Sequence, residues 1–151
     1  MALKQVETPT GLSPGRVAAW LSKQVELGLT EVDLSISQYR ILGLLAEGSA
    51  ISSAIAERLA VRPPSVTSVI DGLVVRGLVV RTHREDDRRR ISLALTPTGE
   101  HLLGDADRVV NVRLEQIALS LNNSKASTRA MENLELWRQA LVAYRAARHG
   151  A

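Results

Sequence analysis

The stretch VRPPSVTSVIDGLVVRGLV, residues 61–79, decides the fold that this sequence predicts. Adjacent prolines are tolerated at the start of a helix, and a residue that precedes a proline favours extended backbone. Pro63 and Pro64 therefore predict a helix start, with Arg62 just outside the helix. Gly77 predicts the point where the helix ends. The side chains expected to face inward have helical spacing: Val66, Val69, Ile70 and Leu73.

A strand pattern follows this helix on both sides of the charged segment RTHREDDRRR, residues 81–90. The apolar residues that alternate there with strand periodicity are Leu78, Val80, Ile91, Leu93 and Leu95. We expect the charged segment to be the loop of a β-hairpin. Thr96 and Pro97 then predict the cap and the first residue of another helix, which extends to about Leu121.

Helical patterns also occupy the rest of the chain. One helix is expected over 16–29, after a loose N-terminal arm, and another over about 36–47, where Ser35 and Gln38 form a capping-box signature. A short helix is expected in 51–61, with Ser52 as a candidate cap. The last helix, after NNSKAS, carries an apolar stripe at spacings of 4, 3, 4 and 3: Ala130, Leu134, Trp137, Leu141 and Tyr144.

Four helices, a hairpin and two more helices make the predicted fold mainly α with a small β-hairpin wing. We interpret it as a winged helix-turn-helix with long N- and C-terminal dimerisation helices. The expected divisions are 1–33 for an arm and helix of the dimerisation region, 34–99 for the DNA-binding domain and 100–151 for the C-terminal dimerisation helices. Leu134, Trp137, Leu141 and Tyr144 are the candidate dimerisation residues.

Composition limits the protein class. A chain of 151 residues that is 45% hydrophobic and 23% charged is long enough to bury a core in one domain, with or without an appendage. It has no cysteine, which excludes disulfides and thiol ligands and fits a reducing compartment. Neither a signal peptide nor an apolar run of about 20 residues is present, so we expect a cytoplasmic location.

The positive charge is concentrated in one part of the chain. Residues 58–90 hold eight arginines and four acids, whereas the remainder holds eleven bases and twelve acids. A local surplus of this kind is typical of a surface that contacts a polyanion. In a winged helix the second helix of the turn motif enters the DNA major groove and the hairpin lies beside it. Candidate DNA-binding residues are therefore Arg62, Ser65, Thr67, Ser68, Arg84, Arg88, Arg89 and Arg90, with Asp87 as a carboxylate that braces Arg89.

Three segments together resemble one family. They are DLSISQYRILGLL at 33–45, PSVTSVIDGLVVRGLVVR at 64–81, and DRR at 87–89 followed by LALTPTG at 93–99. The chain from about 13 to 148 resembles the multiple antibiotic resistance regulator (MarR) family of bacterial transcription factors. The resemblance implies an obligate homodimer with interleaved terminal helices. It also implies a pseudo-palindromic operator that is often released when a small phenolic or anionic ligand binds.

The resemblance also implies roles for single residues. Arg89 matches the arginine at the wing tip that enters the minor groove, Asp87 matches its brace, and Ser65 and Thr67 match contacts of the recognition helix. Two positions depart from the family pattern. Arg62 stands where a small capping residue is usual and Ser68 where arginine is common, so the resemblance does not imply an operator sequence.

Other functions are predicted less specifically. Trp20 and Tyr39 are candidate pocket residues for an aromatic or anionic effector, although plain core packing explains each of them as well. The three histidines have no metal-ligand spacing, and no nucleotide-binding or hydrolase motif is present. We therefore expect no enzyme activity, cofactor or metal. The main hypothesis is a repressor of its own or neighbouring genes. A winged-helix protein-interaction module and a non-specific DNA-binding protein remain as alternatives.

Overall fold

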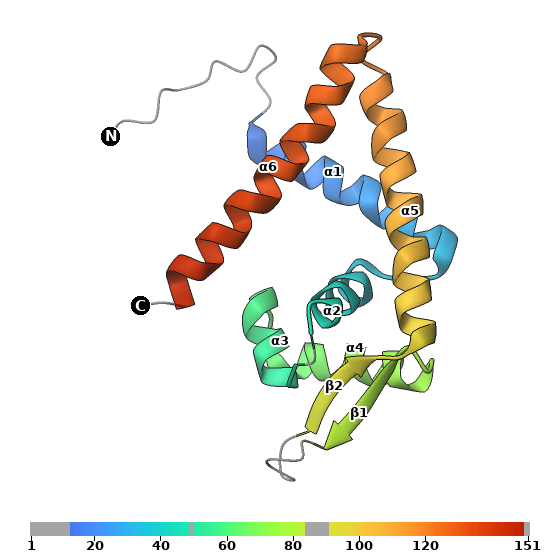
Figure 1. Ribbon diagram of the computed structural model, residues 1–151, viewed down its shortest axis with the longest axis vertical. Helices are drawn as coiled ribbons and strands as arrows, with labels where there is room; N and C mark the ends of the chain where they lie inside the picture. Colours follow the sequence, from blue (N-terminus) through green and yellow to red (C-terminus); the bar gives the residue numbers. More distant parts are fainter. Residues whose placement is uncertain (1–12, 49, 84–90, 150–151) are drawn as a thin grey trace. The chain divides into compact units, whose positions relative to one another are not determined.

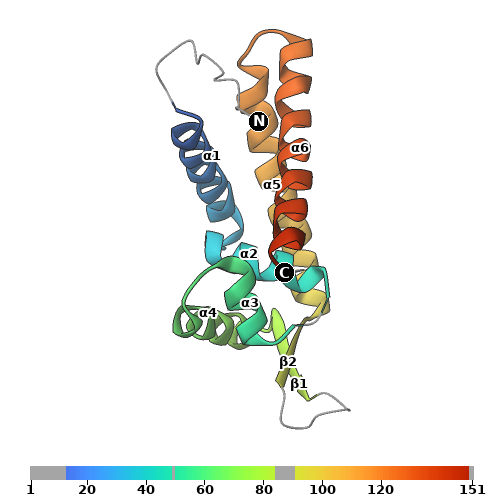
Figure 2. The same ribbon diagram turned by 90° about the vertical axis from the view of Figure 1, so that its left-hand side faces the viewer.

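The computed structural model describes residues 13–48, 50–83 and 91–149 (Figure 1). The chain forms two compact units, Met1–Val109 and Val110–Ala151, and each is described separately below. The first unit holds α1 to α4, the hairpin and the beginning of α5, and the second holds the end of α5 and α6 (Figures 1 and 2). The predicted order of four helices, a hairpin and two helices is confirmed.

Helix α1 spans Pro14–Leu29, two residues earlier than the start expected at Arg16. The reason is the cap at Ser13, whose hydroxyl accepts the N–H of Arg16 at 3.4 Å while Pro14 takes the first helical position. A short 3₁₀ turn, Thr30–Val32, follows and ends at Asp33 in the left-handed region with φ 52°. Leu29 is fully buried and anchors the end of α1.

Helix α2, Ile36–Ala46, begins with the predicted capping box. The Ser35 hydroxyl accepts the N–H of Gln38 at 3.1 Å, and the Gln38 side-chain oxygen accepts the N–H of Ser35 at 2.9 Å. Two N–H groups that the helix leaves unpaired are thereby satisfied. The buried face of α2 consists of Ile41, Leu42, Leu44 and Leu45.

The cap gives a direct test of this local structure. Ser35→Ala is expected to lower the free energy of unfolding by about 1 kcal/mol, because the Gln38 N–H loses its acceptor. Urea unfolding followed by circular dichroism measures the change. Ser37→Ala is the matched control, since Ser37 is exposed and its side chain bonds to no described residue. Equal stability of the Ser35 variant and the control would contradict the role of the cap.

Helices α3 and α4 form the turn motif. Helix α3, Ser52–Leu59, is capped by Ile51 and not by Ser52, so the candidate cap was wrong. Ala50 forms a bridge with Leu93 in the hairpin, which holds Ile51 in extended geometry and lets the helix begin directly after it. Ala60 ends α3 with φ 53° and turns the chain towards α4.

Helix α4 spans Pro63–Val75, as the two prolines predict. Its inward face carries Val66, Ile70 and Leu73, each at most 3% exposed. Gly77, at φ 70°, ends the helix, and the next N–H, that of Leu78, donates to the carbonyl of Leu73 at 2.9 Å.

The hairpin pairs β1, Val79–His83, with β2, Ile91–Leu95, in an antiparallel register that sets Val79 opposite Leu95 and Arg81 opposite Leu93. The expected alternation in the first strand was wrong by one residue. Val79 is 2% exposed and Val80 is 40% exposed. Leu78 lies in the turn that closes α4, where its N–H donates to the carbonyl of Leu73, so strand alternation begins at Val79 and the buried side chain of β1 is Val79 and not Val80.

Helix α5, Pro97–Leu119, is joined tightly to the hairpin. The Thr96 hydroxyl accepts the N–H of Gly99 at 3.0 Å and donates to the carbonyl of Gly77 at 2.7 Å. A Cβ atom at Gly99 would overlap the carbonyl oxygen of Leu78 and lie 3.0 Å from its carbonyl carbon. Glycine is therefore required at this contact. The core of the first unit is completed by Leu34, Ile55, Ala56, Leu93, Leu103 and Ala106.

The second unit contains the end of α5 and helix α6, Ser124–His149. Asn122, with φ 50°, turns the chain, and the Asn123 side chain accepts the N–H of Ala126 at 3.0 Å. Ser127 is 7% exposed, and its hydroxyl lies 2.8 Å from the carbonyl of Ala118. These bonds fix the turn between the two helices.

Candidate nucleic-acid interface

The N-terminal end of α4 presents an extended arginine followed by a rigid first turn. Arg62 has φ −67° and ψ 136°, and its carbonyl accepts the N–H groups of Ser65 at 3.1 Å and Val66 at 3.4 Å. Pro63 and Pro64 have no N–H to satisfy, so this helix end is closed without a side-chain cap. The two prolines hold the first turn in place because their φ angles are fixed.

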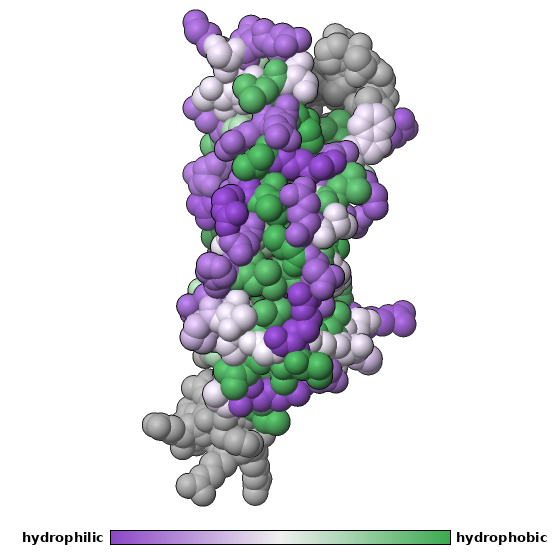
Figure 3. Space-filling model, turned by 90° about the vertical axis from the view of Figure 1, so that its right-hand side faces the viewer, coloured by the Kyte–Doolittle hydropathy of each residue, from purple (hydrophilic) through white to green (hydrophobic). Residues whose placement is uncertain are grey.

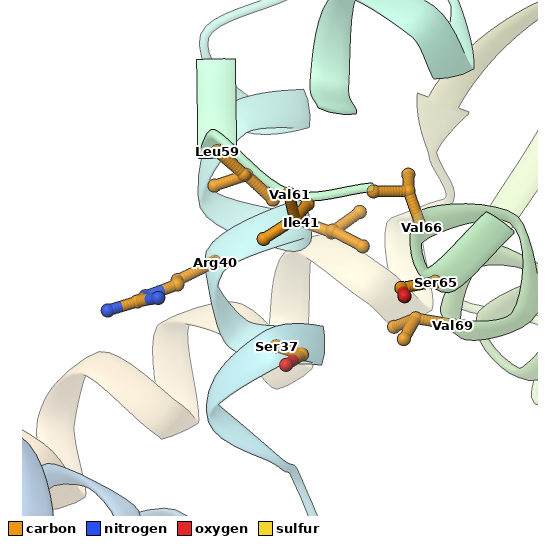
Figure 4. A pocket seen from close by; sticks show the side chains of 8 residues that line it. All are labelled: Ser37, Arg40, Ile41, Leu59, Val61, Ser65, Val66 and Val69. Atoms are coloured by element: carbon orange, nitrogen blue, oxygen red, sulfur yellow. The ribbon is translucent and has the colours of Figure 1, made fainter. Parts of the chain in front are cut away.

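The three hydroxyl side chains predicted at this helix end, Ser65, Thr67 and Ser68, are all exposed. The Thr67 hydroxyl donates to the carbonyl of Pro63 at 3.2 Å, so its proton is used within the helix. Ser65 lies on the flank of α4 that faces α2, beside a cavity of about 70 Å³ (Figure 4). That volume is far below the roughly 300 Å³ at which small-molecule sites begin.

Three of the arginines near α4 form ion pairs with acids, and the sequence did not predict these pairings. Arg81 of β1 bonds Asp71 of α4, and Arg58 of α3 bonds Glu47. Arg76, at the end of α4, donates to the carbonyl of Asp33 at 2.8 Å and lies 3.7 Å from its carboxylate. No fixed sequence spacing signals such pairs. They offset part of the positive surplus found in the sequence.

Arg62 differs from these three arginines. It is exposed and forms no ion pair with any of the residues that the structure describes. Its charge is therefore available to an external anion. The arginines predicted at the wing, with the acid that braces them, lie outside the described residues: Arg84, Asp87, Arg88, Arg89 and Arg90. The paired His83 and Ile91 mark where that segment leaves and rejoins the hairpin.

The two candidate pocket residues have different surroundings. Trp20 is 61% exposed on α1. Tyr39 of α2 is half-buried, and its hydroxyl donates to the Asp107 carboxylate of α5. Burial first, and then the hydrogen bond to Asp107 and the negative charge of that carboxylate, raise the pKa of Tyr39 above its ordinary value. Neither residue lines the cavity of Figure 4, in which the Arg40 side chain points away from the other labelled side chains.

Tyr39→Phe is expected to destabilise the protein at pH 7 by about 1 to 2 kcal/mol, because the variant cannot form the hydrogen bond to a charged acceptor. In the folded state Tyr39 loses its proton at a higher pH than in the unfolded state. This contribution is therefore complete below the unfolded pKa of about 10 and disappears as the pH rises beyond it. Urea unfolding of both proteins from pH 8 to 11 measures the difference. A difference that does not shrink at high pH would contradict the role of the hydroxyl.

Helix α6 exposes much of its predicted apolar stripe. Trp137 is 66% exposed, Leu141 51% and Tyr144 60%, while Leu134 is half-buried. Apolar side chains also reach the surface among polar ones on the face shown in Figure 3. Among the described residues, no helix combines the length and hydropathy needed to cross a bilayer, and no three His, Asp or Glu side chains gather as metal ligands would.

The geometry above matches proteins of known fold and class. A model of the MarR family matches residues 32–90. The HTH-type transcriptional regulator FarR of Neisseria gonorrhoeae is 32% identical over 123 residues, which is 81% of this chain and 83% of that protein.

Solved structures of other proteins share the fold of this chain. The YusO protein of Bacillus subtilis has a TM-score of 0.67 at 26% identity, with 83% of this chain and 89% of that chain covered. The transcriptional repressor CouR, bound to a 23-mer DNA duplex, has a TM-score of 0.70 at 25% identity, with 93% and 99% covered. CouR of Rhodococcus jostii RHA1 has also been solved with p-coumaroyl-CoA, at a TM-score of 0.63 and 25% identity over 80% of this chain and 85% of that chain. Since sequence and fold agree over most of its length, this chain belongs to the MarR family of transcriptional regulators.

Proposed function

We propose that this protein is a homodimeric repressor that binds a pseudo-palindromic operator through α4 and the wing. The observation that carries the proposal is the exposed N-terminal turn of α4, with Ser65, Thr67 and Ser68 beside the unpaired Arg62. Helix α4 packs against β1, and the Asp71–Arg81 pair joins them, so the hairpin has a fixed position beside the helix. CouR, which shares the fold, binds duplex DNA.

The proposed binding mode follows from the dimensions of DNA. A single helix fits the major groove, which is about 12 Å wide, and the N-terminal residues of a recognition helix reach the base edges. Arg84, Arg88, Arg89 and Arg90 are proposed to contact phosphates or the adjacent minor groove, with Asp87 bracing Arg89. In a dimer the two α4 helices would occupy successive major grooves about 34 Å apart.

The dimer is proposed to form through α6 and α1. Exposed apolar side chains at Trp137, Leu141 and Tyr144 cost free energy in water unless a partner covers them. A second copy of this chain offers the same stripe, which suits a two-fold interface. The divisions proposed for these roles are 1–33 and 100–151 for dimerisation and 34–99 for DNA binding.

Trp137→Ala is expected to weaken the dimer by about 2 kcal/mol, roughly thirtyfold, because buried tryptophans dominate interface energies. Sedimentation equilibrium over a range of concentrations measures the dissociation constant. Val142→Ala is the control. Val142 is 53% exposed on the same helix but lies off the stripe, so we expect a change below about 0.5 kcal/mol. Equal effects of the two variants would place the interface elsewhere.

A small-molecule effector is the third part of the proposal. CouR has been solved with p-coumaroyl-CoA, so ligand binding occurs on this fold. Tyr39 and Trp20 remain the proposed effector contacts. An open groove of about 550 Å³ is lined by residues of α2, β2 and α5 and includes Asp107, the partner of Tyr39, whereas Tyr39 and Trp20 themselves do not line it. Because its charged residues, Glu100 and Asp107, are both acids, the groove favours a neutral or cationic aromatic ligand over an anionic one.

The protein is proposed to bind DNA and an effector without catalysing a reaction and without a cofactor, as the regulators similar to this chain suggest. An effector would act by favouring a dimer in which the two α4 helices have the wrong separation. The effect can be no larger than the difference in its affinity for the two dimer geometries.

The experiment that tests the DNA-binding proposal is selection of retained sequences from a randomised duplex library at two salt concentrations. Enrichment of an inverted repeat with half-sites about ten base pairs apart would support the proposal. Salt-sensitive retention without enrichment would indicate non-specific binding. No retention would favour a protein-interaction module.

A further inference from the structure

The surface that α4 offers to DNA lacks the side chains that read purines. Between Pro63 and Val75 there is no arginine, lysine, asparagine or glutamine. Guanine is read in the major groove mainly by arginine or lysine, and adenine by asparagine or glutamine, each through two hydrogen bonds. The body of the helix therefore has no residue suited to a bidentate purine contact.

Asp71, the one charged residue of α4, is also not free to contact a base. Asp71 could accept a hydrogen bond from cytosine, but its carboxylate is bound by Arg81 of β1. Breaking that pair would leave a free cation and a free anion next to phosphate. We therefore expect Asp71 to hold the hairpin against α4 and to make no base contact.

The remaining exposed groups at the helix start are small and largely carbon. Pro64 presents its ring, and Thr67 presents a methyl group, because the proton of its hydroxyl is donated to the carbonyl of Pro63 at 3.2 Å. Ser68 adds one short hydroxyl, and the hydroxyl of Ser65, which is also exposed, lies on the flank of α4 that faces α2. Among the four bases, thymine alone carries a methyl group in the major groove, and apolar contacts are how that group is recognised.

We propose that α4 recognises its half-site mainly through the C5-methyl groups of thymines, contacted by Pro64 and the Thr67 methyl group. This inference rests on the proposed function, since it assumes that α4 enters the major groove. Arg62 directly precedes this helix start and forms no ion pair with a described residue, so it is an available contact for a phosphate or for a single guanine. The main base discrimination then comes from A·T pairs.

The test uses the intact protein and the operator obtained from the randomised library. Each thymine of one half-site is replaced in turn by deoxyuridine, which removes the C5-methyl group and no hydrogen-bonding atom. Each guanine is replaced by 7-deazaguanine, which removes one major-groove acceptor. We expect one or more deoxyuridines to weaken binding about fourfold each, the equivalent of about 0.8 kcal/mol for a buried methyl group. We expect 7-deazaguanine to have a large effect at no more than one position.

Thr67→Ser removes one methyl group from the protein and keeps the hydroxyl. In the dimer this change removes one methyl–methyl contact from each half-site, so we expect the variant to bind the thymine operator about sixteenfold more weakly, about fourfold per half-site. It should show no deoxyuridine effect at one position of the substituted half-site, because that contact is already absent. Undiminished deoxyuridine effects in the variant would overturn the role of Thr67. Changes below twofold at every thymine, together with tenfold losses at two or more guanines, would overturn the whole inference. Failure of the library to yield any preferred sequence would instead refute the proposed function itself.

Discussion

Gly99→Ala is expected to destabilise the first unit by about 3 kcal/mol or more. The new Cβ would overlap the carbonyl oxygen of Leu78, which is backbone and cannot rotate away as a flexible side chain would. The same carbonyl accepts the N–H of Thr96 at 3.1 Å, so a shift would also disturb the start of α5. Overpacking in a rigid contact commonly costs about 1 to 3 kcal/mol, and a backbone clash lies at the upper end.

Gly104→Ala is the matched control, because Gly104 lies in the same helix and a Cβ there meets nothing within 4 Å. Alanine is the better helix former, so we expect this variant to be more stable by up to about 1 kcal/mol. Urea unfolding of the two variants and the parent protein gives the comparison. Unfolding of the Gly99 variant at the same urea concentration as the parent would show that the predicted clash does not exist.

Replacing Arg88, Arg89 and Arg90 together by alanine is expected to weaken operator binding by about 3 kcal/mol or more, over a hundredfold. These arginines are predicted DNA contacts from the sequence and are present twice in a dimer. The slope of log K against log salt should become shallower by about 0.9 for each phosphate that the variant no longer neutralises. Fluorescence anisotropy with the selected operator at several salt concentrations measures both quantities.

The control removes the same charge from other parts of the chain. Arg108, Arg129 and Arg145 are exposed, and none of them is a predicted DNA contact. At protein concentrations where their triple alanine variant is dimeric, we expect it to bind with nearly unchanged affinity and salt slope. Equally weakened binding in both triple variants would mean that net charge alone controls binding. Unchanged binding in the wing variant would remove the wing from the interface.

Local sequence signals predicted the fold well where one short segment determines the structure. The capping box of Ser35 and Gln38 places the start of α2, and Pro63 with Pro64 places the start of α4. Both depend on bonds or clashes within four residues. The exposure of Ser65, Thr67 and Ser68 follows from the same helix, and their role in DNA binding stays a prediction.

The features that the sequence did not reveal depend on residues far apart in the chain. Ile51 caps α3 because Ala50 pairs with Leu93, more than forty positions further along. Val79 and not Val80 is buried in β1 because the turn that closes α4 includes Leu78, whose N–H donates to the carbonyl of Leu73. The pairing of Arg81 with Asp71 and of Arg76 with Asp33 needs the folded arrangement of helices and strands. Side-chain periodicity carries no information on such contacts.

The bridge between Ala50 and Leu93 also bears on aggregation. Each residue donates its N–H to the carbonyl of the other, at 3.1 Å and 2.8 Å, so this edge of β2 is partly covered by the chain itself. A bare strand edge can recruit strands from other molecules, and proteins commonly prevent this by covering the edge or by placing charge on it. The opposite edge, β1, carries Arg81, which is held by Asp71. The bridge thus leaves less of the backbone of β2 available to a strand from another molecule.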